Sequence, residues 1–193
     1  MLAEPIAVTL LVVNALEDLG IPYMIGGSLA SAAYGVARST LDTDLIAVIN
    51  MKQAEPLAST LAKDFYVDIE MIKDSIQHQS SFNIVHLKTM FKVDIFIAKQ
   101  RPYDRNQFQR KILQSISSDP ETLAYLTTPE DIVLVKLEWY RMGGEVSDRQ
   151  WRDILGVLFV QADRLDQDYL RKWAAELGIA DLLQRAFKET GFE

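Results

Sequence analysis

The sequence predicts an α+β protein in which a mixed β-sheet flanked by helices is followed by a helical C-terminal half. Up to about residue 100, runs of β-branched and aromatic residues alternate with segments of helical periodicity. Beyond Pro102 the apolar residues follow mostly helical spacing. With 193 residues, 49% of them hydrophobic and 24% charged, the chain can bury a sizeable core. We expect a core over residues 1–100 and a helical subdomain over 101–193 that packs on it.

The first half of the chain opens with a predicted helix over 4–19. Leu10, Val13 and Leu16 recur there at helical spacing, and Gly20 and Pro22 end the pattern. The residues that follow predict a strand over 23–25, a glycine turn, a helix rich in small residues that packs on the sheet, and a strand over 42–49. They then predict a helix over 53–65, a strand over 66–72 and a loop over 75–81. A hairpin of strands over 82–87 and 91–98 completes this half.

The second half begins with a basic, amphipathic segment over 103–116 and a short extended piece over 122–127. Thr128 and Pro129 place a capping hydroxyl before a proline at the first helical position. Ser147 and Gln150 have capping-box spacing and start a further helix. These signals predict helices over 128–143, 147–161, 167–177 and 180–188.

Gly26-Gly27-Ser28 follow the predicted strand over 23–25 and precede a helix. Two glycines let the chain turn sharply and bring its backbone close to a ligand, and Ser28 can cap the helix. Free N–H groups at a helix start favour negative charge, so this segment can hold a phosphate. A plain turn with a helix cap is the alternative when the segment is taken alone.

Asp42 and Asp44 open the predicted strand over 42–49 and point to the same face, because side chains alternate along a strand. Two such carboxylates repel each other unless a cation lies between them. Asp94 lies in a later strand among apolar residues, where an unpaired carboxylate is costly. A metal ion is one partner for Asp94, and Lys92 on the same face is a structural alternative. A solvated strand entry is the alternative for Asp42 and Asp44.

Composition excludes several classes of protein. The formal net charge of −7 argues against non-specific coating of nucleic acid. The chain has no cysteine, which excludes disulfides and cysteine-based zinc sites. The apolar run over 6–13 is too short to span a membrane and is bracketed by acids, so we interpret it as part of an amphipathic helix. We expect a cytoplasmic protein without a membrane partner.

Taken together, these motifs resemble the polymerase-β type nucleotidyltransferase superfamily, and within it the bacterial minimal and abortive-infection type enzymes. The likeness covers roughly residues 21–158. Thr43 stands where the family pattern often has an apolar residue, and the gap from Ser28 to Asp42 is long. The motifs are Ile25-Gly26-Gly27-Ser28, Asp42-Thr43-Asp44-Leu45, Asp94, Pro129-Glu130-Asp131, Lys136 and Asp153.

The resemblance implies a nucleotidyltransferase-type sheet and transfer of a nucleoside monophosphate from an NTP to a hydroxyl. It implies two Mg²⁺ ions, with Mn²⁺ as a substitute, held about 4 Å apart by carboxylate oxygens. Asp42 and Asp44 would hold the nucleotide-side ion, and Asp94 would help to bind the second ion and receive the acceptor's proton. Gly26, Gly27 and Ser28 would hold the triphosphate.

Three further residues are candidates with open alternatives. Lys136 either binds phosphate or extends its ammonium to the surface from an apolar helix. Asp153 is catalytic by the resemblance, or pairs with Arg149 one turn earlier. Arg38 precedes the acidic strand and either contacts phosphate or is a surface residue.

The acceptor is open between tRNA, a protein and a small molecule. Arg101, Arg105, Arg110 and Lys111 could contact an RNA backbone or form an exposed basic face. The resemblance adds a toxin with a cognate antitoxin protein as a further expectation. The alternative function is a catalytically inactive nucleotide-binding or partner-binding module of the same fold. A dinucleotide-binding domain is disfavoured because Gly26-Gly27-Ser28 lacks the further glycine spacing.

Overall fold

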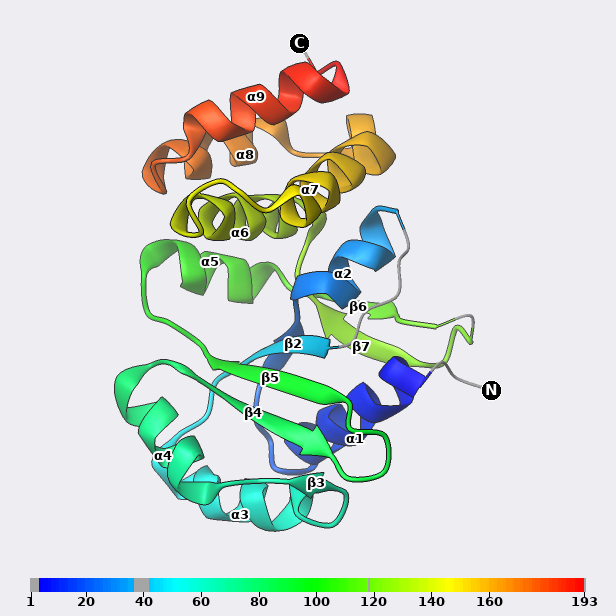
Figure 1. Ribbon diagram of the computed structural model, residues 1–193, viewed down its shortest axis with the longest axis vertical. Coiled ribbons are helices and arrows are strands. Elements are labelled where there is room, and N and C mark those ends of the chain that lie inside the picture. Colours follow the sequence, from blue (N-terminus) through cyan, green and yellow to red (C-terminus); the bar gives the residue numbers. More distant parts are fainter. Residues whose placement is uncertain (1–3, 37–41, 118, 193) are drawn as a thin grey trace. The chain divides into compact units, whose positions relative to one another are not determined.

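The computed structural model describes residues 4–36, 42–117 and 119–192, and its chain divides into two compact units (Figure 1). The first unit comprises Met1–Gly26 and Ser39–Leu126, and the second comprises Gly27–Arg38 and Thr127–Glu193. We expected a division near residue 100. The first unit extends to Leu126 instead, because β7 (Leu123–Leu126) pairs in parallel with β1 (Tyr23–Ile25).

The first unit is built on a mixed sheet that, within the described residues, has seven strands in the order β3-β4-β5-β2-β1-β7-β6. The pairs β1–β7 and β2–β5 are parallel, and the other neighbours are antiparallel. The remaining strands are β2 (Asp42–Ala47), β3 (Phe65–Tyr66), β4 (Ser81–His86), β5 (Lys92–Ile97) and β6 (Ile112–Ser115). The helices of this unit are α1 (Glu4–Asp18), α3 (Met51–Leu61), α4 (Ile69–His78) and α5 (Pro102–Arg110). The predicted α+β fold with a mixed sheet is confirmed.

One face of this sheet is closed by helices. Helix α1 contacts β2, α4 contacts β4 and β5, and α3 lies against both α1 and α4. Thr43 on β2 is fully buried on this face, and its hydroxyl lies 2.9 Å from that of Thr9 on α1. That hydrogen bond satisfies the hydroxyl of Thr43, which stands where the family pattern often has an apolar residue. Because side chains alternate, Asp42 and Asp44 point to the opposite face.

Two predictions within the first unit are wrong. The expected strand over 66–72 and loop over 75–81 are a two-residue strand followed by helix α4. Asp68 caps α4 by accepting hydrogen bonds from the N–H groups of Glu70 and Met71, and Ile72 and Ser75 form its buried side. The expected amphipathic segment over 103–116 divides into α5 and β6, because residues 112–115 pair with β7.

The second unit is helical. Thr128 caps its central helix α6, and Ser147 caps α7, each by accepting a backbone hydrogen bond in the first turn. The four predicted C-terminal helices are confirmed. The helices are α2 (Gly27–Tyr34), α6 (Pro129–Met142), α7 (Asp148–Gln161), α8 (Gln167–Glu176) and α9 (Ala180–Thr190), with a 3-10 turn η1 (Ala162–Arg164). Within the described residues, no helix is both long and apolar enough to cross a membrane.

Helix α2 packs against α6 and α7, whereas we expected it to pack on the sheet. Close approach is possible because glycines lie at the contact. A Cβ atom at Gly35 would lie 3.0 Å from the backbone nitrogen of Val157, and one at Gly156 would meet Val36 Cγ2 at 3.5 Å. The first distance is too short for an ordinary contact, and the second is normal.

We therefore expect Gly35→Ala to lower the free energy of unfolding by about 1–3 kcal/mol, since backbone atoms must move to admit the methyl group. Gly156→Ala is the matched control on the facing helix. It should be neutral or stabilise by up to about 1 kcal/mol through better helix propensity. Urea unfolding followed by circular dichroism measures both, and equal stabilities of the two variants would contradict the close contact at Gly35.

Candidate functional site

Strands β2 and β5 bring three of the predicted carboxylates to one face of the sheet. The two strands are parallel, and Asp44 is the direct partner of Asp94 while Asp42 is the partner of Lys92. Alternate residues Thr43, Val93 and Ile95 are fully buried on the other face. Directly paired residues on neighbouring strands lie about 5 Å apart, so the carboxylates of Asp44 and Asp94 are close neighbours.

Lys92 supplies a cation to this face. Its Nζ lies 2.7 Å from Oδ2 of Asp94, and the side chains are 44% and 20% exposed, respectively. The hydrogen bond that Lys92 donates to Asp94 raises the pKa of Lys92, partial burial opposes this shift, and the negative charges of Asp94, Asp42 and Asp44 raise it further. The ammonium of Lys92 therefore interacts electrostatically with all three carboxylates.

The donor set suits a divalent cation, because hard ions such as Mg²⁺ bind carboxylate oxygens. In the described part of the chain, no group of three or more His, Cys, Asp or Glu side chains is arranged to hold a metal ion. Oδ2 of Asp94 lies against the ammonium of Lys92. The chemistry of the residues thus fits the expected ion, while Asp94 is oriented by Lys92.

The glycine turn is shared between the two units. Gly26 ends the first unit, and its N–H donates a 2.9 Å hydrogen bond to the carbonyl oxygen of Asp44. A Cβ atom at Gly26 would come within 3.0 Å of Ile46 Cδ1. Gly27 opens α2 with φ of +54°, a left-handed conformation that favours glycine. Ser28, which we expected to cap this helix, is its second residue.

Lys136 and Asp153 form a buried ion pair in the second unit. Nζ of Lys136 donates to Oδ2 of Asp153 at 2.9 Å, and the side chains are only 11% and 10% exposed. The alternative in which Lys136 extends to the surface is therefore wrong, and Asp153 has a partner on α6. No spacing in the sequence indicates this pair, because its members are 17 residues apart on different helices.

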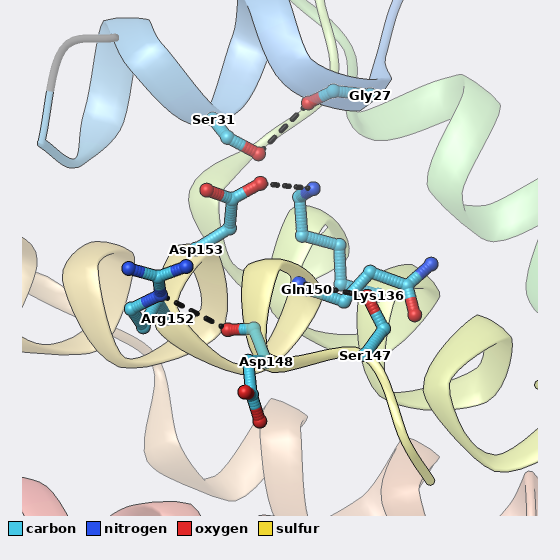
Figure 2. Close-up of polar contacts among 8 residues, drawn as sticks. All are labelled: Gly27, Ser31, Lys136, Ser147, Asp148, Gln150, Arg152 and Asp153. Atoms are coloured by element: carbon cyan, nitrogen blue, oxygen red, sulfur yellow. Dashed lines mark hydrogen bonds and ion pairs between the residues drawn. The ribbon is translucent and has the colours of Figure 1, made fainter. Parts of the chain in front are cut away.

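Asp153 also lines a small pocket. Figure 2 shows the polar contacts around the ion pair. Helix α2 faces the carboxylate of Asp153 with Ser31, whose hydroxyl donates to the carbonyl oxygen of Gly27 at 2.8 Å. Arg152 lies on α7 next to Asp153 and donates from Nε to the carbonyl oxygen of Asp148 at 3.3 Å. The pocket is lined by Ser31, Ala32, Val36, Arg152, Asp153 and Gly156.

The acids of Pro129-Glu130-Asp131 have structural partners. Asp131 is fully buried and accepts hydrogen bonds of 2.7 Å from the hydroxyls of Thr128 and Tyr169. Glu130 accepts a 3.0 Å bond from the N–H of Asp166, at the start of α8. Both acids thereby tie the start of α6 to α8. Sequence reasoning did not find these contacts, because Tyr169 and Asp166 carry no local signal for them.

The structure therefore places the predicted residues in two groups. Asp42, Asp44 and Asp94 lie together on β2 and β5 in the first unit, with Gly26 hydrogen-bonded to Asp44. Lys136 and Asp153 lie together in the second unit, which also contains Gly27 and Ser28. Arg38 lies outside the described residues.

Comparisons with known proteins identify the fold. No model of a protein family and no curated protein sequence matches the chain. A crystal structure of ANT(2″)-Ia in complex with adenylyl-2″-tobramycin is similar, with a TM-score of 0.61, 11% identity, and coverage of 91% of this chain and 97% of the other. An antigenic nucleotidyltransferase-like protein from Paracoccidioides brasiliensis gives a TM-score of 0.55 at 22% identity, with coverage of 96% and 93%. The chain thus has the fold of nucleotidyltransferases.

The buried ion pair makes a prediction about stability. Lys136→Met removes the ammonium that faces the buried Asp153 carboxylate and should lower the free energy of unfolding by roughly 3–5 kcal/mol. Adding Asp153→Leu removes the buried negative charge and should recover much of that loss. Urea unfolding of the two single variants and the double variant gives the coupling energy, and additive effects would contradict a coupled pair.

Proposed function

We propose that the protein is a Mg²⁺-dependent nucleotidyltransferase that moves a nucleoside monophosphate from an NTP to a hydroxyl acceptor. The observation that carries this proposal is the common face of Asp42, Asp44 and Asp94, with Asp44 and Asp94 directly paired. The hydrophobic core does not require these carboxylates, because buried residues on the other face of the sheet anchor both strands. The similarity to nucleotidyltransferase structures supports the same activity.

In the proposed reaction the acceptor hydroxyl attacks the α-phosphorus of the NTP. A new oxygen–phosphorus bond forms, the bond from the α-phosphorus to the bridging oxygen breaks, and pyrophosphate leaves with the electron pair. Asp94 takes the proton of the hydroxyl. Asp42 and Asp44 would hold the nucleotide-side Mg²⁺ or Mn²⁺ and Asp94 would help to hold a second ion. When bound, such ions stabilise the entering and leaving oxygens.

The resemblance assigns the phosphates of the nucleotide to further residues. Gly27 and Ser28 at the start of α2 would hold the triphosphate, because backbone N–H groups at a helix start favour anions. Arg38, outside the described residues, would be a further phosphate contact.

The acceptor is better matched by a small molecule or a protein than by tRNA. Two of the basic residues available for an RNA backbone already have partners. Arg101 forms a two-point contact with Asp104 at 2.6 and 2.9 Å. Lys111 lies over the rings of Phe108 and Tyr125, and burial lowers its pKa. ANT(2″)-Ia, which has a similar structure, was crystallised with an adenylylated antibiotic, tobramycin.

A catalytically inactive binding module is the second candidate. The specific observation in its favour is the ion pair of Lys92 with Asp94, which gives Asp94 a structural partner without a metal ion. In that case the protein would bind a nucleotide or a protein partner and transfer nothing.

The activity is tested by incubating the protein with labelled NTPs and Mg²⁺ or Mn²⁺. Separated small-molecule, tRNA and protein fractions of a cell extract are supplied as acceptors. We expect transfer by the wild type, and a loss of at least about 1,000-fold in Asp44→Ala, because this carboxylate would hold a metal ion that stabilises developing charge. Asp74→Ala removes an exposed carboxylate on α4 and is the control that should transfer normally. Equal transfer by wild type and Asp44→Ala would overturn the mechanism, and the labelled fraction identifies the acceptor.

A toxin restrained by an antitoxin protein is the biological setting that the abortive-infection likeness favours. Expression of the wild type should then arrest bacterial growth, and expression of Asp44→Ala should not, since arrest would depend on transfer. Colony counts after induction measure this effect, with Asp74→Ala as the matched control. Equal growth of all three strains would remove the toxin role and leave the transferase activity standing.

A further inference from the structure

The pocket between α2 and α7 has no part in the reaction described above. All six residues that line it belong to the second unit. Ser31, only 4% exposed, lies at its buried side, whereas Val36 is 69% exposed and lies where the pocket meets solvent. The pocket has room for about one group of the size of a water molecule. It can therefore hold a single small group of a larger ligand.

The polar groups of the pocket include both acceptors and donors of hydrogen bonds. The Ser31 hydroxyl donates its hydrogen to the carbonyl oxygen of Gly27 at 2.8 Å, so its oxygen can accept a hydrogen bond from a ligand. The carboxylate of Asp153 adds acceptor oxygens, and the guanidinium of Arg152 adds N–H donors. Figure 2 shows Ser31 on α2 facing Asp153 on α7. A group bound between them can donate and accept at once.

This combination selects a neutral hydroxyl. An anionic group would approach the carboxylate of Asp153 and the lone pairs of Ser31, which both repel it. A cationic group would approach the guanidinium of Arg152. A hydroxyl is uncharged, has the size of a water molecule, and both donates and accepts hydrogen bonds. The chemistry of the pocket thus indicates a ligand that carries an alcohol group.

Helix α2 sets the distance between this pocket and the predicted phosphate site. Ser31 follows Gly27 by four residues, which is about 6 Å along the helix axis. Their hydrogen bond joins the glycine turn directly to the pocket. In the proposed function the triphosphate lies at the start of α2. In a ribonucleotide the sugar is attached to the α-phosphate, so its hydroxyls lie within one ring of the phosphates.

We propose that the pocket binds a ribose hydroxyl of the nucleoside triphosphate, with Ser31 as a residue that determines specificity for ribonucleotides over deoxyribonucleotides. This inference rests on the proposed function and names its nucleotide substrate by the sugar. Gly156 contributes by having no side chain. A Cβ atom there would meet Val36 Cγ2 at 3.5 Å, and both residues line the pocket, so a methyl group would narrow it without a clash.

Calorimetric titration of the full chain tests the proposal without an acceptor and without turnover. The four common ribonucleoside triphosphates are titrated first, followed by the 2′-deoxy and 3′-deoxy forms of the one that binds most tightly. The wild type should bind the ribonucleotide roughly threefold to tenfold more tightly than at least one deoxy form, because one hydrogen-bonded hydroxyl is lost.

Two variants assign this preference to the pocket. Ser31→Ala should bind the ribonucleotide about as weakly as the wild type binds that deoxy form, and its affinity for the deoxy form should stay unchanged. Gly156→Ala should also reduce the preference, because its methyl group occupies space in the pocket. Ser75→Ala is the matched control, since Ser75 is a buried serine on α4 of the first unit, and it should keep the full preference.

The outcomes separate this inference from the function on which it rests. Equal affinity of the wild type for all three sugar forms would overturn the role of the pocket and leave the proposed function standing. An equal loss of affinity for the ribonucleotide and the deoxy forms in Ser31→Ala would show a purely structural role of Ser31 and would also overturn the inference. Absence of nucleotide binding by the wild type would refute the proposed function and the role of the pocket together.

Discussion

The parallel pairing of β2 with β5 is the constraint on which the candidate site depends. It sets Asp44 directly beside Asp94, and it sets Asp42 beside Lys92. A shift of one residue in this register would turn one set of carboxylates into the core, where Thr43, Val93 and Ile95 now lie. The buried side of the two strands therefore fixes the charged side, and the hydrophobic core of the first unit positions the chemistry.

Charge compensation follows a different rule in each unit. In the second unit, Lys136 and Asp153 are shielded from water, so each needs the other and neither can leave without a large cost. In the first unit, Lys92 and Asp94 are partly exposed, and water can replace either partner. The same kind of ion pair is thus a fixed structural element in one place and an exchangeable contact in the other.

Glycines allow two helices of the second unit to pack closely. Gly35 and Gly156 let α2 approach α7 closely, which places Ser31 opposite Asp153 beside a small pocket (Figure 2). At the start of α6, the buried carboxylate of Asp131 is satisfied by two hydroxyl groups, and Glu130 receives an N–H from α8. These contacts connect the first turn of the central helix to its neighbours by hydrogen bonds rather than by apolar packing alone.

The sequence by itself determined the helices with strong caps, the β4–β5 hairpin and the alternation that puts Asp42 and Asp44 on one face, because these depend on residues close together in the chain. It misassigned residues 66–81, where the cap at Asp68 outweighs weak alternation, and residues 103–116, where pairing with β7 makes a strand. Only the tertiary structure decided that Asp44 meets Asp94, that Lys136 meets Asp153 and that α2 packs with α6 and α7. Each of these contacts joins segments far apart in sequence, so no local pattern specifies the partner.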